Sequence, residues 1–447
     1  MADLVRDQLL SPLGRTVLRC AAGVALLVAT ACAAAPRTAA TSAVPAGSFA
    51  SGRYRNLFAE AGHSPAEVRR KLDTAFAQLF HGDSATETVF YWTGTNANGR
   101  LAYLSDINNH DVRSEGMSYG MMIAVQMDRK AEFDALWNWA RTYMYNAAPT
   151  HPAYRFFSWS MKTDGTPNSE SPAPDGEEYW VTSLYFASAR WGDGQGIYAY
   201  RAMADSLLSA MKNRGVITGP WRSRPQRVAT EGPEFNVEHR MVRFTPDMNR
   251  PDHTDPSYHL PAFYELWARW GPAEDREFWR EAARTSRDFF QKATNSVTAL
   301  APDYANFDGT SVTASFNQRS GTFGPDAWRT AANWSVDWSW WSADPRERVL
   351  SDRIQAFFDR EGIAAYGNRY TLDGKKLDSP HSTALVATNA VASLAASDTA
   401  RARRFVEELW NASIPSGQYR YYDGMWYMMG LLHCAGEFRI WTPRGER

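Results

Sequence analysis

The strongest constraint on the fold is an alternation of two kinds of segment that continues from residue 64 to residue 435. Six segments are apolar on every side, which is typical of fully buried helices: 114–127, 176–191, 257–270, 325–341, 382–396 and 424–435. Six others have one apolar and one charged face: 65–80, 131–145, 195–211, 273–292, 346–360 and 399–410. Two concentric layers bury both patterns, the apolar helices inside and the amphipathic helices outside. We therefore predict an all-α fold, an (α/α)6 barrel of six inner and six outer helices.

A helical solenoid is the competing architecture, but it requires a repeat of fixed length, and none is visible. In a barrel whose inner helices all run in one direction, their N-termini share one rim with the long loops that precede them. Ten polar residues are then expected on this rim: Asp111, Glu115, Asp175, Asp255, Asp326, His381, Ser382, Tyr421, Tyr422 and Asp423. A single carboxylate before a helix is usually a cap or a dipole partner, whereas several that converge raise one another's pKa values.

The helix that begins near residue 114 illustrates both interpretations. Ser114 is predicted as its N-cap, which places Glu115 in the first turn. Glu115 either balances the helix dipole or acts as a catalytic acid. Because a helix N-terminus favours the ionised form, the second role requires that burial, or neighbours such as Asp111 and Asp175, outweigh the dipole.

Composition excludes several classes of function. The net charge of −1 gives no electrostatic footprint for nucleic acid. Cys434 is the only cysteine beyond residue 32, the nine histidines are scattered, and neither a phosphate-binding loop nor a Gly-x-Ser-x-Gly elbow is present. We therefore predict no metal and no organic cofactor, and the sequence does not indicate an oligomeric state. The 18 Trp, 20 Tyr and 22 Phe instead favour a sugar-binding cleft, because pyranose rings stack on aromatic planes.

Five motifs carry a resemblance to a known family. They are Ser-Glu-Gly-Met-Ser-Tyr-Gly-Met at 114–121, Lys-Thr-Asp-Gly at 162–165, Pro-Ala-Pro-Asp-Gly-Glu-Glu-Tyr at 172–179, Asp-Pro-Ser-Tyr-His-Leu-Pro-Ala at 255–262 and Tyr-Tyr-Asp-Gly-Met-Trp at 421–426. Together they resemble glycoside hydrolase family 8, in particular its xylan-active branch, over about residues 53–442. The resemblance implies an (α/α)6 barrel, in agreement with the helix pattern, and inverting hydrolysis of β-1,4-xylosidic bonds in xylan or xylo-oligosaccharides.

The same resemblance implies roles for five residues. Glu115 is expected to be the general acid and Asp255 the general base that activates water, as inversion requires. Asp175 matches a carboxylate that holds the distorted sugar at the cleavage point. Trp159 matches a stacking platform and Tyr370 a ligand near the same sugar, although core packing explains either aromatic ring equally well.

Family members differ in the position at which they cut. Those that release xylose from the reducing end close the cleft with a loop carrying Leu-His-Pro, whereas residues 318–326 here read Gln-Arg-Ser-Gly-Thr-Phe-Gly-Pro-Asp. This difference favours endo cleavage, with a reducing-end xylose-releasing exo-oligoxylanase as the alternative and an endo-β-1,4-glucanase as a further one. A polysaccharide lyase is a candidate from another class, but the carboxylate-rich rim argues against it. The intact carboxylate motifs argue against a catalytically dead sugar-binding module.

The N-terminal region predicts export. Arg15 and Arg19 precede an apolar run at residues 20–35, and small residues follow, as in a secretory signal. We predict a signal peptide at 1–32, a flexible linker at 33–50 and the catalytic domain at 51–447. The expected location is periplasmic or extracellular. A lipid anchor at Cys32 is the alternative and the only membrane contact expected, and the long stretch before Arg15 favours a translation start further downstream.

Overall fold

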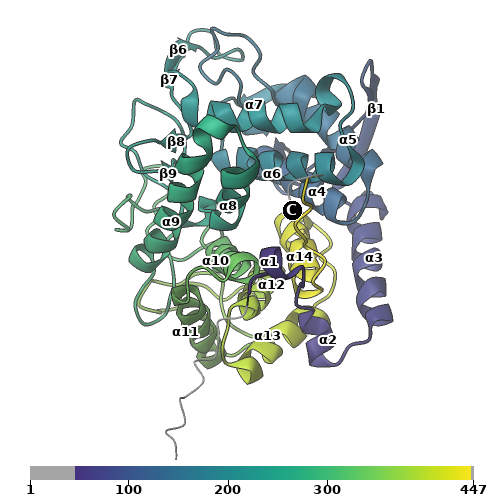
Figure 1. The fold of residues 1–447 in the computed structure, drawn as a ribbon, viewed down its shortest axis with the longest axis vertical. Helices are drawn as coiled ribbons and strands as arrows, with labels where there is room; N and C mark the ends of the chain where they lie inside the picture. The colour runs from purple at the N-terminus through teal and green to yellow at the C-terminus, as the bar shows by residue number, and fades with distance from the viewer. Residues whose placement is uncertain (1–45, 444–447) are drawn as a thin grey trace, which may run out of the picture. The chain divides into compact units, whose positions relative to one another are not determined.

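The structure, a computed structural model, describes residues 46–443, and twelve of the helices in this part form two layers (Figure 1). The inner helices are α4 (Ser114–Gln126), α6 (Pro174–Trp191), α8 (Pro261–Trp270), α10 (Trp328–Trp341), α12 (Thr383–Val391) and α14 (Arg420–Cys434). The outer helices are α3 (Pro65–His81), α5 (Lys130–Trp139), α7 (Tyr200–Asn213), α9 (Arg276–Ala293), α11 (Arg346–Glu361) and α13 (Thr399–Asn411). The last inner helix, α14, packs against the first, α4, and closes the ring. The predicted (α/α)6 barrel is confirmed.

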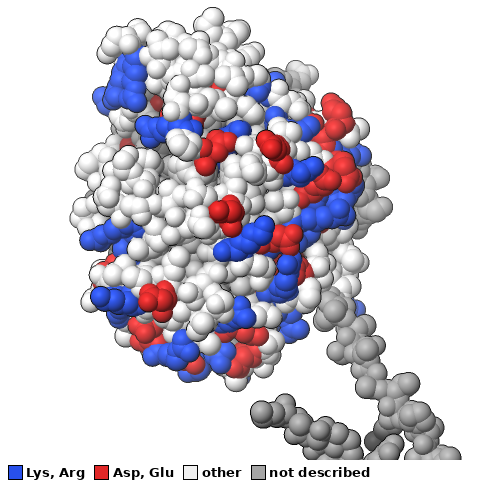
Figure 2. All heavy atoms as spheres, turned by 90° about the vertical axis from the view of Figure 1, so that its left-hand side faces the viewer, with Lys and Arg blue, Asp and Glu red and all other residues white. Residues whose placement is uncertain are grey.

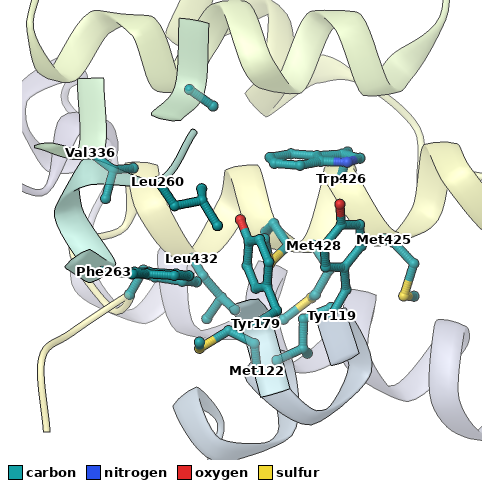
Figure 3. Packing of buried hydrophobic residues seen from close by; sticks show 14 of the residues in the cluster. Tyr119, Met122, Tyr179, Leu260, Phe263, Val336, Met425, Trp426, Met428 and Leu432 are labelled. Atoms are coloured by element: carbon teal, nitrogen blue, oxygen red, sulfur yellow. The ribbon is translucent and has the colours of Figure 1, made fainter. Parts of the chain in front are cut away.

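The inner helices pack against one another through large apolar side chains. Figure 3 shows this core, to which α4, α6, α8, α10 and α14 all contribute: Tyr119, Met122, Tyr179, Phe263, Val336, Met425, Trp426, Met428 and Leu432. Every residue of α4 after Glu115 is buried, as its wholly apolar sequence predicts. Glycine allows the closest approaches, since a Cβ at Gly176 of α6 would overlap the Ser114 side chain.

The helix starts show one correct and one wrong prediction. Ser64 caps α3 in a capping box with Glu67, and Pro65 is the first helical residue. Ser114, in contrast, is not the N-cap of α4. The chain enters this helix from strand β3 (Val112–Arg113), so Arg113 is the cap residue and Ser114 is already helical. The Ser114 hydroxyl donates to Oε2 of Glu115 at 3.2 Å instead of capping the helix.

Short strands lie in the connections between helices. Strand β1 (Phe90–Asn96) pairs with β2 (Gly99–Leu104). The many Asn and Gly residues in this region predict an irregular stretch instead of this hairpin. Strand β3 pairs with β4 (Ser160–Met161), which pairs with β5 (Pro167–Ser169). Two further hairpins join β6 (Ile217–Pro220) to β7 (Val228–Glu231) and β8 (Phe235–Asn236) to β9 (Met241–Val242).

The folded part begins earlier than the predicted boundary at residue 51. Helix α1 (Ser48–Ser51) packs on α10: the Phe49 ring lies 4.5 Å from that of Trp341, and Ser48 Oγ donates to the Ser339 carbonyl. Helix α2 (Leu57–Ala61) then packs on α13. The end of the predicted linker is therefore ordered, because its apolar side chain has a partner. The predicted signal peptide, including Cys32, lies outside the described residues.

The surface agrees with the balanced charge of the sequence. On the face drawn in Figure 2, acidic and basic side chains are interspersed around a broad uncharged area, with no large region of one sign. Within residues 46–443, no helix combines the length and apolar character needed to cross a membrane.

Candidate active site

A cavity of about 640 Å³ opens where the N-termini of four inner helices meet. Seven of the ten rim residues predicted from the sequence line it: Glu115, Asp326, His381, Ser382, Tyr421, Tyr422 and Asp423. Arg113, Tyr119, Trp328 and Arg329 complete much of its wall. The N-termini of four of the six inner helices therefore meet at this cavity, which combines carboxylates with aromatic rings, whereas Asp111, Asp175 and Asp255 do not line it.

Glu115 lies in the first turn of α4 at the wall of this cavity. Its Oε1 accepts a hydrogen bond of 2.7 Å from the indole Nε1 of Trp159. Burial, followed by the nearby charge of Asp175, raises the pKa of Glu115 to about 8. The two effects together outweigh the helix dipole, so Glu115 keeps its proton at neutral pH. A protonated carboxyl beside a cavity is what a general acid requires.

The structure holds Trp159 firmly in this position. Its carbonyl accepts from the Ser114 amide at 2.9 Å, and its own amide donates to the Ser171 carbonyl at 3.1 Å. The Arg113 guanidinium lies 5.2 Å from the centre of the half-buried indole ring. In the structure, Trp159 therefore contacts and orients Glu115. Core packing was the alternative that the sequence left open for this ring.

A buried arginine that the sequence analysis missed connects the other carboxylates. Nη1 of Arg329 lies 2.6 Å from Oδ2 of Asp175 and donates to the Tyr119 hydroxyl at 2.7 Å. Nη2 lies 3.5 Å from Oδ2 of Asp255 and 3.4 Å from Oδ1 of Asp326. The signal for it was present in the sequence, since Arg329 is the only basic residue in segment 325–341, which was predicted to be buried.

Asp175 and Asp255 are both fully buried beside this guanidinium. Burial raises the pKa of Asp175 to about 6, although Arg329 counteracts it. Burial, followed by the charge of Asp326, raises the pKa of Asp255, which Arg329 and the Ser257 amide lower again. Asp255 also caps the short helix Pro256–Tyr258, with Oδ1 accepting from the Ser257 amide at 2.7 Å. Arg329 thus pairs with two carboxylates that lie 80 residues apart in the chain.

Tyr370 is not part of the site, so its predicted role is wrong. Its side chain is completely buried, with the ring edge-on to Phe357 of α11. Its hydroxyl accepts from the Gly367 amide and donates to Glu361. Backbone pairing with Phe323 turns the ring into the core, where the apolar environment stabilises it. The core-packing interpretation is the correct one for this residue.

No group of three or more His, Cys, Asp or Glu side chains within residues 46–443 is placed to hold a metal ion. The described site offers the chemistry of carboxyl groups, the Arg329 guanidinium and the surrounding hydroxyl and indole groups.

Comparison with known proteins agrees with this chemistry. The model of the family "Glycosyl hydrolases family 8" matches residues 90–436. The chain belongs to glycosyl hydrolase family 8. It is therefore a glycoside hydrolase, and the (α/α)6 barrel is the fold of its family.

Two curated relatives and one solved structure are similar to this chain over most of its length. The reducing-end xylose-releasing exo-oligoxylanase Rex8A of Paenibacillus barcinonensis is 42% identical over 397 residues, 88% of this chain and 98% of the relative. The corresponding enzyme of Halalkalibacterium halodurans is 41% identical over 403 residues, 90% of this chain and 97% of the relative. A family 8 protein of Teredinibacter turnerae, solved with xylobiose, is 56% identical with a TM-score of 0.87, covering 89% of this chain and all of that one.

Proposed function

We propose that this protein hydrolyses β-1,4-xylosidic bonds of xylo-oligosaccharides with inversion at the anomeric carbon. The observation that carries the proposal is the position of Glu115 at the wall of the cavity, where Trp159 donates to it and where Arg329, paired with the buried carboxylates of Asp175 and Asp255, lines the same wall. An inverting glycosidase needs one protonated and one ionised carboxyl group. Related structures solved with xylobiose and xylohexaose support a xylo-oligosaccharide as the substrate.

In this mechanism Glu115 gives its proton to the glycosidic oxygen as the bond to C1 breaks. Trp159 orients the carboxyl group by donating to Oε1, and Ser114 does so by donating to Oε2. Asp255 takes a proton from the water that attacks C1 from the opposite face, so the product has the inverted configuration. The positive charge of Arg329 favours the ionised form of Asp255, against the burial that raises its pKa, and Arg329 also holds Asp175, which binds the hydroxyl groups of the distorted sugar.

We propose further that the enzyme releases xylose from the reducing end of its substrates. Three curated relatives, 38–42% identical, are named as reducing-end xylose-releasing exo-oligoxylanases. These relatives support reducing-end release better than the endo cleavage that the sequence favours. The match to this chain covers nearly the full length of each relative.

Endo cleavage is the second candidate, and two observations favour it. A structure 55% identical to this chain, solved with xylohexaose, is named as a xylanase. In addition, residues 318–326 lack the Leu-His-Pro sequence that we associate with a closed cleft.

A product time course on xylohexaose separates these candidates. Xylose and xylopentaose as the only early products would establish reducing-end release, whereas a mixture of shorter oligosaccharides would establish endo cleavage. Proton NMR of the new reducing ends should show the α-anomer first, and an initial β-anomer would contradict inversion. No cleavage of xylohexaose, with cleavage of cello-oligosaccharides, would move the assignment to a glucanase. Unsaturated products from uronate polymers, followed in the ultraviolet, would indicate a lyase.

We also propose that the protein is exported to the periplasm or the exterior through a signal in residues 1–32. The basic residues followed by an apolar run support this location. Cell fractionation and N-terminal sequencing of the mature chain test it. Retention in the cytoplasm with an intact N-terminus would contradict the proposal, and a blocked N-terminus at Cys32 would identify the lipoprotein alternative.

A further inference from the structure

An exposed phenylalanine lies on the Asp255 side of the site. Phe316 is the only exposed phenylalanine within residues 46–443, with 56% of its surface accessible. Single exposed apolar side chains are common on protein surfaces, but Phe316 stacks on other rings beside the proposed site, which leaves its exposed face available to a ligand. The sugar rings of a xylo-oligosaccharide are the ligand chemistry that the proposed function brings there.

The turn that carries Phe316 is held by hydrogen bonds on both sides. The Asn317 amide donates to the Ala314 carbonyl at 3.0 Å, and the Ala314 amide donates to Oγ of Ser320 at 2.9 Å. Ser320 is completely buried, and its hydroxyl donates to the Val312 carbonyl. The ring of Phe316 is therefore presented at the tip of an ordered turn, and little conformational entropy has to be lost when a ligand binds.

Phe316 belongs to a group of near-parallel rings that we call the aromatic platform: Phe244, His253, Tyr258 and Phe316. The rings of Phe244 and Phe316 are 6.0 Å apart at 17°, those of Phe244 and His253 are 5.1 Å apart at 26°, and those of Phe244 and Tyr258 are 5.9 Å apart at 23°. Phe244 is partly buried, and Tyr304 supports it from 4.3 Å away.

The platform continues directly from the proposed catalytic base. His253 and Tyr258 flank Asp255 in the sequence, and the Arg329 guanidinium lies 5.6 Å from the centre of the Tyr258 ring. The cavity is lined by other residues, among them Tyr421 and His381, and by no platform residue. A chain of sugars that fills the cavity and passes Asp255 would therefore reach the platform next.

We propose that Phe316, supported by Phe244, stacks a xylose ring of the substrate on the side of Asp255 opposite to the cavity, and so determines how strongly longer oligosaccharides are preferred. This inference rests on the proposed function. Its consequence is a dependence on substrate length: short substrates that end before the platform do not use Phe316, whereas long ones do.

The test compares Phe316→Ala and Phe316→Tyr with the wild type on oligosaccharides from xylobiose to xylohexaose. Loss of one stacking contact should lower kcat/KM of the alanine variant about tenfold on the longest substrate and leave it unchanged on the shortest. The tyrosine variant should keep the wild-type length dependence. Val349→Ala, which also removes an exposed apolar side chain but on outer helix α11, should not change it.

Binding to the inactive Glu115→Gln protein, with and without Phe316→Ala, gives the same comparison by calorimetry without turnover. If the wild type cleaves these substrates but Phe316→Ala matches it at every length, the inference is wrong and the proposed function stands. An equal loss at every length, the shortest included, would also overturn the inference. If the wild type cleaves no xylo-oligosaccharide, the proposed function itself fails.

Discussion

The indole Nε1 of Trp159 lies 2.7 Å from Oε1 of Glu115 and donates a hydrogen bond to it. A hydrogen bond donated to a carboxylate stabilises the ionised form, so it lowers the pKa of Glu115 while burial and Asp175 raise it. The balance leaves the pKa at about 8. Trp159 therefore acts on both the orientation of the acid and its proton affinity.

Replacing Trp159 by phenylalanine should separate these effects. Without the indole N–H, the pKa of Glu115 rises, and the alkaline limb of the kcat/KM profile should move to higher pH. We expect kcat to fall about tenfold because the acid is less well oriented. Trp410→Phe on outer helix α13 is the control and should leave the profile unchanged. A raised KM with an unmoved alkaline limb would show that Trp159 acts as a stacking platform instead.

The wild-type pH profile tests the assignment of the acid. A general acid works only while protonated, and the pKa of Glu115 is raised to about 8. We therefore expect kcat/KM on xylohexaose to fall as the pH rises through about 8, since this parameter reports the free enzyme. Activity that already falls above pH 5 would show that Glu115 is ionised at neutral pH and is not the acid.

Glu115→Gln removes the transferable proton but keeps the shape of the side chain. Turnover of xylo-oligosaccharides should fall by at least about a thousandfold, while the melting temperature and oligosaccharide binding stay near those of the wild type. Asp423→Asn, at another inner-helix N-terminus of the same cavity, is the matched control and should retain more activity. Wild-type rates in Glu115→Gln would disprove the assignment.

Arg329→Met leaves two buried carboxylates without their cation. Removing one partner of a buried ionic network costs about 3–5 kcal/mol, so the free energy of unfolding should drop by this amount and activity should be lost. Arg69→Met, which breaks an exposed pair with Asp73 on outer helix α3, should cost less than about 1 kcal/mol. Urea denaturation of both variants measures the difference. Similar losses for the two would show that the network contributes little.

The buried carboxyl group of Glu234 predicts that the stability of the protein changes with pH. It is completely buried, and neither oxygen hydrogen-bonds to a residue within 46–443. Burial, followed by the charges of Glu177 and Glu178, raises its pKa above the ordinary 4.5. A raised pKa means that the group favours folding while protonated and that this contribution is lost as the pH rises.

Glu234→Gln cannot ionise, so its melting temperature should rise relative to the wild type between pH 5 and pH 9. Glu277→Gln on the surface of α9 should show a constant difference over the same range. A constant difference for Glu234→Gln as well would mean that Glu234 is not buried in the neutral form.

The fold was predictable because a helix that is apolar on all sides has only one stable place, inside other helices. Segments 114–127 and 273–292 differ so clearly in charge that their layers follow from the sequence alone. The β1–β2 hairpin was not predictable in the same way, because Asn96 and Gly99 support a tight turn only after the strands beside them have partners.

The positions of Glu115 and Asp255 were predictable because each lies at a helix start, and their catalytic roles stay predictions. Arg329 was missed because its role depends on two carboxylates from other parts of the chain, Asp175 and Asp255. Tyr370 was misplaced because a motif gives a residue type and spacing but not the direction of the side chain. The backbone pairing with Phe323 decides that direction, and it forms only in the folded protein.

Because α14 packs on α4 to close the helix ring, the surroundings of Glu115 depend on the last helix of the barrel. Tyr421 of α14 lies so close to Gly116 that any Cβ there would overlap its hydroxyl, and its neighbours on α14 complete the cavity wall beside Glu115. A ribosome synthesises Glu115 about 300 residues before Tyr421. We therefore expect a fragment that lacks α14 to be inert even if its other helices assemble, because Glu115 then lacks the cavity wall that α14 supplies.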